Sequence, residues 1–388
     1  MQRNEADVVV LGGGPAGCVT ALALAHRKLS AVVIERSNYE APRLGETLPP
    51  LARPLLAELG VWERFVREEH TPSYGIRSAW GRDELYENDF IFNPYGAGWH
   101  IDRARFDALL AVAAEAAGAQ VYRGAQLASI ARVKAVAKAG AWELEIAQGG
   151  ATHSYRAKFF VDASGRAAAL ARGQGARRVV YDHLIGAVAF LPADSTLDSF
   201  TLVEASERGW WYSALLPSSE FVMAYMTDAD LYARGARDSA CYWREQLEVA
   251  RHTRARANGF DLRIAPRIAP AGSSLLDPVA GANWLAVGDA ALTFDPLSAQ
   301  GICRALEFGP RAAVAIAAHL AGDAAALAAY AHAVAARFND YLLARQTFYG
   351  RERRWPDSAF WQRRQVAAAA HLPGYARDTR GYTSDSPS

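Results

Sequence analysis

The chain has 388 residues, 51% of them hydrophobic and 21% charged, with a net charge of +1. This composition is typical of a globular protein with a sizeable core, and the near-zero charge excludes a bulk attraction to nucleic acid or to an anionic membrane. Three widely spaced cysteines favour a reducing, cytoplasmic location, and no run of about 18 apolar residues predicts a membrane-spanning helix.

The N-terminal segment predicts a strand, a glycine-rich turn, a helix and a second strand. Residues 7–11 (DVVVL) have the apolar character of a strand buried in a parallel sheet, residues 18–25 form a helix, and residues 31–34 (AVVI) form the next strand. Acids before the first strand and glycines within the apolar stretch argue against a signal peptide. The turn, GGGPAG, matches the G-x-G-x-x-G pattern of dinucleotide-binding βαβ units.

Each residue type in this turn suits a bound dinucleotide. Gly12 permits the tight turn, Gly14 lets a pyrophosphate approach the backbone, and Gly17 lets helix and strand pack closely. The helix N-terminus offers free N–H groups and a partial positive charge to phosphate. Glu35, which ends the second strand, is placed to accept hydrogen bonds from ribose hydroxyls. The glycines alone are weak evidence, their context strengthens it, and the pattern fits NAD and FAD equally well.

Four later segments carry polar residues beside glycines or prolines. They are residues 43–50 (RLGETLPP), residues 98–107 (GWHIDRARFD), the strand-like residues 159–166 (FFVDASGR), and residues 284–302, where a short apolar strand precedes GDAALTFDPLSAQGI. Asp102 is expected to cap a helix that begins at the next residue.

Together these segments resemble the FAD-dependent monooxygenases of the p-hydroxybenzoate hydroxylase type and the related flavin-dependent halogenases, from about residue 7 to about residue 365. The resemblance implies that Asp289 binds the FAD ribityl chain and that the stretch from Pro296 to Gly301 leads into a helix facing the pyrimidine edge of the flavin. It also implies that Arg103 reaches the cofactor phosphates, the alternative being an ordinary surface arginine. The candidate cofactor-binding residues are Gly12, Gly14, Pro15, Ala16, Gly17, Glu35, Arg36, Arg43, Glu46, Thr47, Arg103, Asp162, Asp289, Pro296, Gly301 and Ile302.

The expected fold class is α/β, with a Rossmann-like FAD-binding domain interleaved with a β-sheet substrate domain and a helical C-terminus. We assign residues 1–70, 100–175 and 270–330 to the FAD-binding domain, 71–99 and 176–269 to the substrate domain, and 331–388 to a C-terminal helical segment and tail. Strand-like runs at 184–190, 200–204, 210–216 and 221–226 support the sheet. The candidate substrate-pocket residues are Trp99, Trp211 and Tyr212. The aromatic and basic run at 345–364 is expected to dock on the core, with a lid or a partner-docking surface as the alternative.

The chain departs from the tryptophan halogenases at three places. Their W-x-W-x-I-P motif is replaced by YSALLP at 212–217, no lysine lies between Glu46 and Gly98, and Ala299 and Gln300 stand where those halogenases have Ser-Thr. These absences remove a charged relay and a set of halide donors. They favour hydroxylation of an aromatic ring over halogenation of free tryptophan.

Segments 79–85, 92–96, 179–182 and 353–357 resemble flavoproteins that help to build tryptophylquinone cofactors. This resemblance implies an aromatic, indole-like substrate, either a small molecule or a tryptophan-containing protein, that is hydroxylated by a flavin C4a-hydroperoxide. Electrons would come from NAD(P)H directly or through a flavin reductase. Glu46 and His100 are the candidate catalytic residues, and each is either catalytic or structural. No metal, nucleic acid or membrane is expected to bind.

Three alternatives remain open at this point. The first is a flavin-dependent halogenase or a natural-product tailoring hydroxylase on the same scaffold. The second is a flavin reductase of the geranylgeranyl-reductase type, which shares the GE loop and the GD segment. The third is a non-catalytic flavoprotein chaperone.

Overall fold

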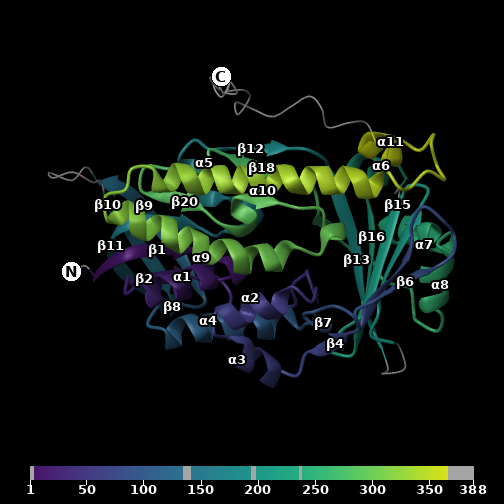
Figure 1. Ribbon diagram of the computed structural model, residues 1–388, viewed down its shortest axis with the longest axis horizontal. Helices are drawn as coiled ribbons and strands as arrows, with labels where there is room; N and C mark the ends of the chain where they lie inside the picture. Colours follow the sequence, from purple (N-terminus) through teal and green to yellow (C-terminus); the bar gives the residue numbers. More distant parts are fainter. Residues whose placement is uncertain (1–3, 134–140, 194–197, 236–237, 366–388) are drawn as a thin grey trace, which may run out of the picture.

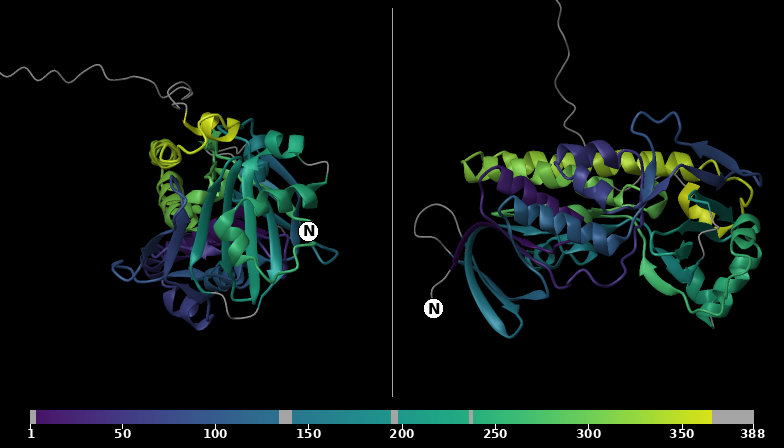
Figure 2. Two further views of the ribbon diagram at one scale, coloured as in Figure 1. Left: turned by 90° about the vertical axis from the view of Figure 1, so that its right-hand side faces the viewer. Right: turned by 90° about the horizontal axis from the view of Figure 1, so that it is seen from below.

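The computed structural model describes residues 4–133, 141–193, 198–235 and 238–365 (Figure 1). Two large β-sheets lie at opposite ends of an elongated molecule, and long helices run along one side of it (Figures 1 and 2). No helix among these residues has the length and apolar character needed to span a bilayer.

The first sheet has a parallel centre built from segments that are far apart in the chain. Its strands lie in the order β19 (Ala280–Gly281), β20 (Trp284–Ala286), β11 (Ala151–Asp162), β1 (Asn4–Leu11), β2 (Ala31–Ile34) and β8 (Gln120–Tyr122). The strands β20, β11, β1, β2 and β8 pair in parallel, while β10 (Ala141–Gln148) and β9 (Ala125–Val133) extend β11 as an antiparallel meander. Val8, Val9 and Val10 are fully buried, as expected for a strand covered on both faces.

Helices cover the first sheet. Helix α1 (Pro15–His26) follows β1 and packs against α4 (Arg103–Ala116) and α9 (Gly301–Leu320). It begins three residues before the predicted residue 18, because a proline suits the first turn of a helix. The predicted cap of α4 is confirmed, since the Asp102 carboxylate accepts hydrogen bonds from the N–H groups of Ala104 (2.8 Å) and Arg105 (3.1 Å).

The second sheet joins strands from both predicted inserts. Its order is β17 (Arg267–Pro270), β13 (Leu184–Pro192), β16 (Glu220–Asp228), β15 (Gly209–Leu215), β14 (Thr201–Ser206), β5 (Gly75–Ala79) and β6 (Tyr86–Asp89). The four strand-like runs of the sequence correspond to β13, β14, β15 and β16. One face packs against α6 (Ala229–Gly235), α7 (Ser239–Glu248) and α8 (Arg251–Arg256), and the other faces the C-terminal helices.

The C-terminal helices connect the two sheets. Helix α10 (Ala326–Tyr349) runs along the molecule from the first sheet to the second (Figure 1), and α11 (Ala359–Gln365) docks on the second sheet. Phe360 and Trp361 are fully buried, and the Trp361 indole N–H donates to the carbonyl of Ser206 at 3.0 Å. The predicted docking of this aromatic run on the core is therefore confirmed.

The remaining elements are short. They are helices α2 (Ala52–Glu58), α3 (Trp62–Arg67) and α5 (Ala169–Gly173); 3-10 helices η1 (Gly165–Ala167), η2 (Gly288–Ala290) and η3 (Pro296–Ser298); and strands β3 (Thr47–Leu48), β4 (Thr71–Ser73), β7 (Gly98–His100), β12 (Arg177–Val180), β18 (Ser274–Asp277) and β21 (Leu292–Thr293). These strands form two three-stranded sheets, in the orders β12–β18–β21 and β3–β7–β4.

Candidate active site

The glycine-rich turn between β1 and α1 is tightly packed at Gly12 and Gly17 and open at Gly14. Gly12 has φ 108°, and a Cβ on it would lie 2.3 Å from the carbonyl oxygen of Ala163, while a Cβ on Gly17 would lie 1.9 Å from the carbonyl oxygen of Gly12. A Cβ on Gly14 would meet no atom within 4 Å. Because no side chain caps α1, its first N–H groups face this space, which fits a phosphate.

The ionised Glu35 carboxylate links the glycine-rich turn to the turn that follows β2. It accepts hydrogen bonds from the backbone N–H of Gly13 (2.7 Å), from the N–H and hydroxyl of Ser37 (3.0 and 2.5 Å) and from Arg43 (3.0 Å). Burial alone would raise the pKa of Glu35, but these hydrogen bonds and the Arg43 charge hold it below its ordinary value. Arg36, the next residue, is exposed. A contact between Glu35 and a ribose stays a prediction.

Arg103 is part of a buried charged cluster and not a surface residue. Asp107, fully buried, lies 2.7 Å from Arg43 and 3.2 Å from Arg103, and Arg103 also donates to the carbonyl of Leu44. The cluster fixes the 43–50 loop against α4. The sequence motif contained Asp107, yet its role as the shared partner of two arginines was not predicted.

The Asp162 carboxylate is committed to its own loop. One oxygen accepts from the N–H and hydroxyl of Ser164 (3.0 and 2.6 Å), and the other accepts from the N–H of Ala171 (2.8 Å). The side chain is fully buried. It therefore shapes the turn after β11, and a contact between Asp162 and the cofactor stays a prediction.

Asp289 lies next to the glycine-rich turn although the two are remote in sequence. Gly288 has φ 62°, and a Cβ on it would lie 2.5 Å from the Cβ of Ala16, so that η2 sits directly on the start of α1. The Asp289 side chain is 43% exposed and is held by the buried Arg304 at 2.5 Å. An anchored but accessible carboxylate at this point fits a polyol ligand.

The stretch from Pro296 to Ile302 forms η3 and the start of α9. Asp295 is buried and caps η3 through the N–H of Leu297 (3.0 Å). The N-terminus of α9 has no side-chain cap, and a Cβ on Gly301 would meet no atom within 4 Å. The first N–H groups of α9 therefore have no side-chain cap either, and the space beside Gly301 is open.

A hydrogen-bonded chain crosses the junction between the small sheet of β3, β7 and β4 and the second sheet. The hydroxyl of Thr47 lies 2.6 Å from that of Tyr212 and 3.3 Å from Nδ1 of His100, whose Nε2 lies 2.9 Å from the carbonyl oxygen of Ser199. A carbonyl oxygen can only accept, so Nε2 carries the hydrogen and Nδ1 is an acceptor. Burial lowers the pKa of His100 to about 4, so the ring is neutral near pH 7.

Glu46 is buried beside this chain, and its Oε1 has no hydrogen-bond partner among the described residues. Burial raises the pKa of Glu46, and Arg103 opposes the shift only in part. A buried polar atom without a partner is costly unless a ligand satisfies it. This oxygen, the open space at Gly14 and the accessible Asp289 carboxylate together fit FAD.

Two predicted pocket residues, Trp99 and Trp211, point away from the junction. Adjacent residues of a strand face opposite sides, and Tyr212 and His100 take the inner side. Trp211 is fully buried against Trp243 of α7 (5.1 Å between ring centroids), and Trp99 packs against Trp62 of α3 (5.3 Å). A role of these two tryptophans in the substrate pocket stays a prediction, and Tyr212 lies at the junction.

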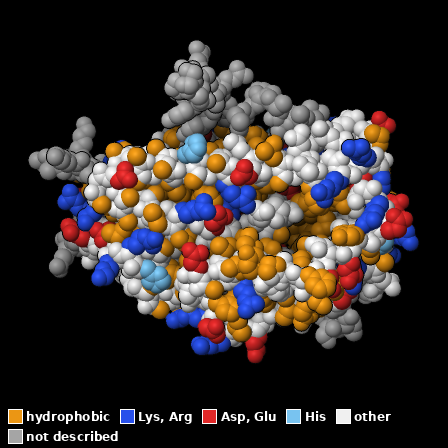
Figure 3. Space-filling view, in the orientation of Figure 1, with side chains coloured by type: hydrophobic (Ala, Val, Ile, Leu, Met, Phe, Trp, Pro, Cys, Tyr) orange, Lys and Arg blue, Asp and Glu red, His pale blue; other side chains and the backbone are white. Residues whose placement is uncertain are grey.

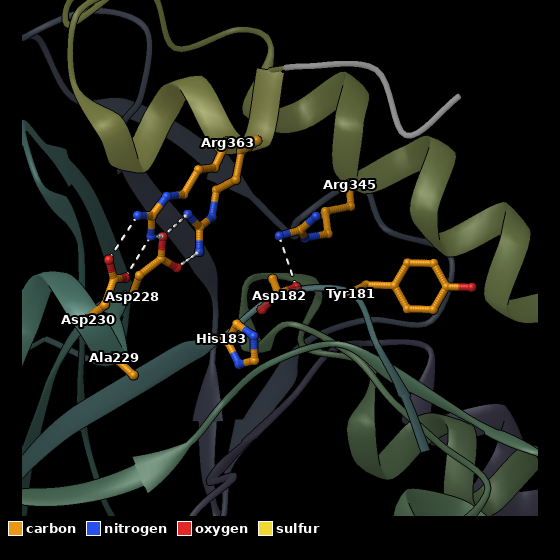
Figure 4. A pocket seen from close by; sticks show the side chains of 9 residues that line it. Tyr181, Asp182, His183, Asp228, Ala229, Asp230, Arg345 and Arg363 are labelled. Atoms are coloured by element: carbon orange, nitrogen blue, oxygen red, sulfur yellow. Dashed lines mark hydrogen bonds and ion pairs between the residues drawn. The ribbon is translucent and has the colours of Figure 1, made fainter. Parts of the chain in front are cut away.

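The surface is hollowed near the junction. Figure 3 shows a recess on one face, rimmed by hydrophobic side chains, between the helical layer and the second sheet. A pocket of about 490 Å³ is lined by α10, α11, the end of β16, the start of α6 and the loop at residues 181–183 (Figure 4). In its wall Arg345 is 3.0 Å from Asp182 and 3.5 Å from Asp295, so it links this pocket to the cap of η3.

Comparison with known proteins agrees with this geometry. A family model described as an FAD-binding domain matches residues 5–342. The chain belongs to this FAD-binding family. Its members are enzymes, and the chain is an FAD-dependent oxidoreductase of the superfamily that contains the flavin-dependent halogenases and monooxygenases, as the sequence predicted.

Among the relatives of this FAD-binding enzyme is LodB of Marinomonas mediterranea, a candidate FAD-dependent oxidoreductase by its description. It is 30% identical over 371 residues, which cover 94% of this chain and 98% of LodB. A 1H-pyrrole-2-carbonyl-[peptidyl-carrier protein] brominase of Pseudoalteromonas luteoviolacea is 27% identical and covers 80% of this chain and 77% of its own length.

Solved structures share the fold at lower identity. The myxobacterial chondrochloren halogenase CndH has a TM-score of 0.82 at 22% identity and covers 94% of this chain and 87% of its own. The peptidyl tryptophan dihydroxylase QhpG, essential for tryptophylquinone cofactor biogenesis, has a TM-score of 0.78 at 23% identity and covers 96% of this chain and 82% of its own.

Proposed function

We propose that the enzyme hydroxylates an electron-rich aromatic ring, and that this ring is a tryptophan side chain carried by a protein. The observation that carries the proposal is the hydrogen-bonded chain Tyr212–Thr47–His100 at the junction between the sheets. All three groups are neutral near pH 7, because burial raises the pKa of Tyr212 and lowers that of His100. Hydroxyl and imidazole groups in series can pass a proton from one end of the chain to the other.

The chain would remove the proton that an aromatic ring loses on hydroxylation. Bound, reduced FAD supplies the activation of oxygen. The Tyr212 hydroxyl would take a proton from the substrate, pass its own to Thr47, and Thr47 would protonate Nδ1 of His100. The peptide N–H groups of α1 and the Asp289 carboxylate would hold the cofactor, and the second sheet would exclude water from the ring.

Halogenation is the alternative, since several relatives are halogenases. Among the described residues, no lysine lies at the junction to support it. Lys28 is exposed and Lys158 is 69% exposed and pairs with Asp7, and the other two lysines lie outside the described residues. We further propose that electrons come from NAD(P)H, directly or through a flavin reductase.

The test supplies reduced FAD, oxygen and bromide together with free tryptophan, a tryptophan-containing peptide, or a small phenol. Mass spectrometry should show the addition of one or two oxygen atoms to the peptide and no bromine isotope pattern. Tyr212→Phe should lower the hydroxylation rate about 100-fold, the usual scale for a proton-transfer group, while the FAD dissociation constant stays within twofold. A brominated product, or full activity of Tyr212→Phe, would contradict the proposal.

A further inference from the structure

An aromatic and apolar surface lies exposed on the segment between residues 74 and 95. Phe92 is 93% exposed and Ile91 is 75% exposed. Soluble proteins seldom leave such clusters uncovered unless a partner binds there. Of the fourteen large hydrophobic side chains exposed in the described part of the chain, six belong to this segment: Tyr74, Leu85, Tyr86, Ile91, Phe92 and Tyr95.

The same segment contains an open sheet edge. Strand β6 is the last strand of the second sheet, and all four of its residues are exposed. The N–H of Phe90 donates to the carbonyl of Tyr74 at 2.8 Å, and bonded pairs alternate along an antiparallel ladder. The even-numbered residues of β6 therefore bond to β5, and the backbone N–H and C=O groups of Glu87 and Asp89 point away from the sheet.

The charge of this edge selects the kind of strand that would pair with it. Glu87 and Asp89 are two residues apart and so lie on one face of β6. The described residues supply one hydrogen bond to each carboxylate, from Arg77 (2.9 Å) and from the N–H of Ile91 (2.8 Å), and a carboxylate accepts about four. Residues 82–95 hold one arginine and four acids, a net charge of −3. A basic strand is therefore complementary.

The open edge at β6 is followed in the chain by the strand that carries His100. The loop after β6 leads directly into β7, whose last residue is His100. In Figure 1, β6 lies at the outer edge of the second sheet, and β7 lies between that sheet and α2. The strand registers place the Asp89 end of β6 at the same end of the sheet as Ser199, which bonds to His100.

We propose that β6 and residues 90–95 form a docking edge for the protein substrate. An extended, basic segment of that substrate adds beside β6 as an eighth strand, with main-chain hydrogen bonds to Glu87 and Asp89 and apolar contacts to Ile91 and Phe92. Strand addition of this kind takes affinity from the backbone and specificity from alternate side chains. The inference rests on the proposed function, because the bound segment is taken to carry the tryptophan that the enzyme hydroxylates.

The probes are three capped, fluorescently labelled twelve-residue peptides with one tryptophan, identical except that alternate positions carry lysine, glutamate or serine. Fluorescence anisotropy should show the lysine peptide binding at least tenfold more tightly than the other two. Glu87→Pro removes one outward N–H without breaking a bond to β5, and it should weaken binding at least tenfold. The matched control Glu87→Gln keeps the N–H and should weaken binding less. Hydrogen exchange should slow at Glu87 and Asp89 when the peptide binds.

FAD content and thermal midpoint show that Glu87→Pro is folded. Equal affinity of the three peptides, equal affinity of wild type and Glu87→Pro, or a dimer in light scattering that Glu87→Pro dissociates would each overturn the docking edge. Binding with the expected pattern but without oxidation of the peptide would support the docking edge and contradict the proposed function.

Discussion

Replacing Gly14 should separate cofactor binding from folding. Its backbone has φ −72° and ψ −176°, which any residue adopts, and a Cβ there meets no protein atom within 4 Å. Gly14→Ala should therefore change the free energy of unfolding of the apoprotein by no more than about 1 kcal/mol. With FAD bound, the same methyl would stand between the pyrophosphate and the first N–H groups of α1. Losing two hydrogen bonds to a charged group costs at least about 3 kcal/mol, or about 150-fold in Kd.

The comparison variant is Gly17→Ala, whose Cβ would lie 1.9 Å from the carbonyl oxygen of Gly12. It should destabilise even the apoprotein by more than about 4 kcal/mol, because the turn itself must move. Flavin fluorescence titration gives Kd, and urea unfolding of the apoproteins gives the stability. The reasoning fails if the larger Gly14→Val binds FAD as tightly as wild type, or if Gly14→Ala and Gly17→Ala are equally unstable.

Three further outcomes are expected. Asp289→Ala should weaken FAD binding by about 1–3 kcal/mol through loss of a charge-assisted acceptor; calorimetry measures it, Asp289→Asn is the control, and an unchanged Kd would make the acid purely structural. Burial lowers the pKa of His100 in the folded protein to about 4, so the unfolded chain binds more protons than the folded chain below about pH 6.5. The free energy of unfolding should be full at pH 7 and fall by up to about 3 kcal/mol towards pH 4. His100→Asn should make the urea midpoint less dependent on pH, and an unchanged pH dependence in this variant would refute the reasoning. Trp361→Ala should cost about 3–5 kcal/mol by leaving a cavity under α11, and a thermal midpoint equal to wild type would contradict the packing.

Features that depend on neighbouring residues were predictable from the sequence. The βαβ unit, the acid at the end of β2 and the Asp102 cap each follow from a short pattern whose physical meaning does not change with context. The docking of α11 also follows, because a run of large aromatic side chains is costly to leave in water.

Features that depend on the relative placement of the two sheets were not predictable. Alternation along β15 requires Trp211 and Tyr212 to face opposite sides, but it does not say which side meets the first sheet. The size and aromaticity of Trp211 favoured it as a pocket residue, but in the structure its ring packs against α7. The link from Arg345 to Asp182 and Asp295 joins three segments with no local signal, and only the folded chain brings them together.

The parallel pairing of β11 with β20 ties the cofactor site to the order of synthesis. On the ribosome the glycine-rich turn emerges early, but Asp289, which lies directly after β20 and packs on the start of α1, follows only after most of the chain has been made. At 5–20 residues per second, Asp289 appears roughly 15–55 s after Gly14. The nascent chain must hold an incomplete sheet throughout this interval. If Asp289 binds the flavin as proposed, flavin capture would follow the pairing of β20 with β11 and so would come late in biogenesis.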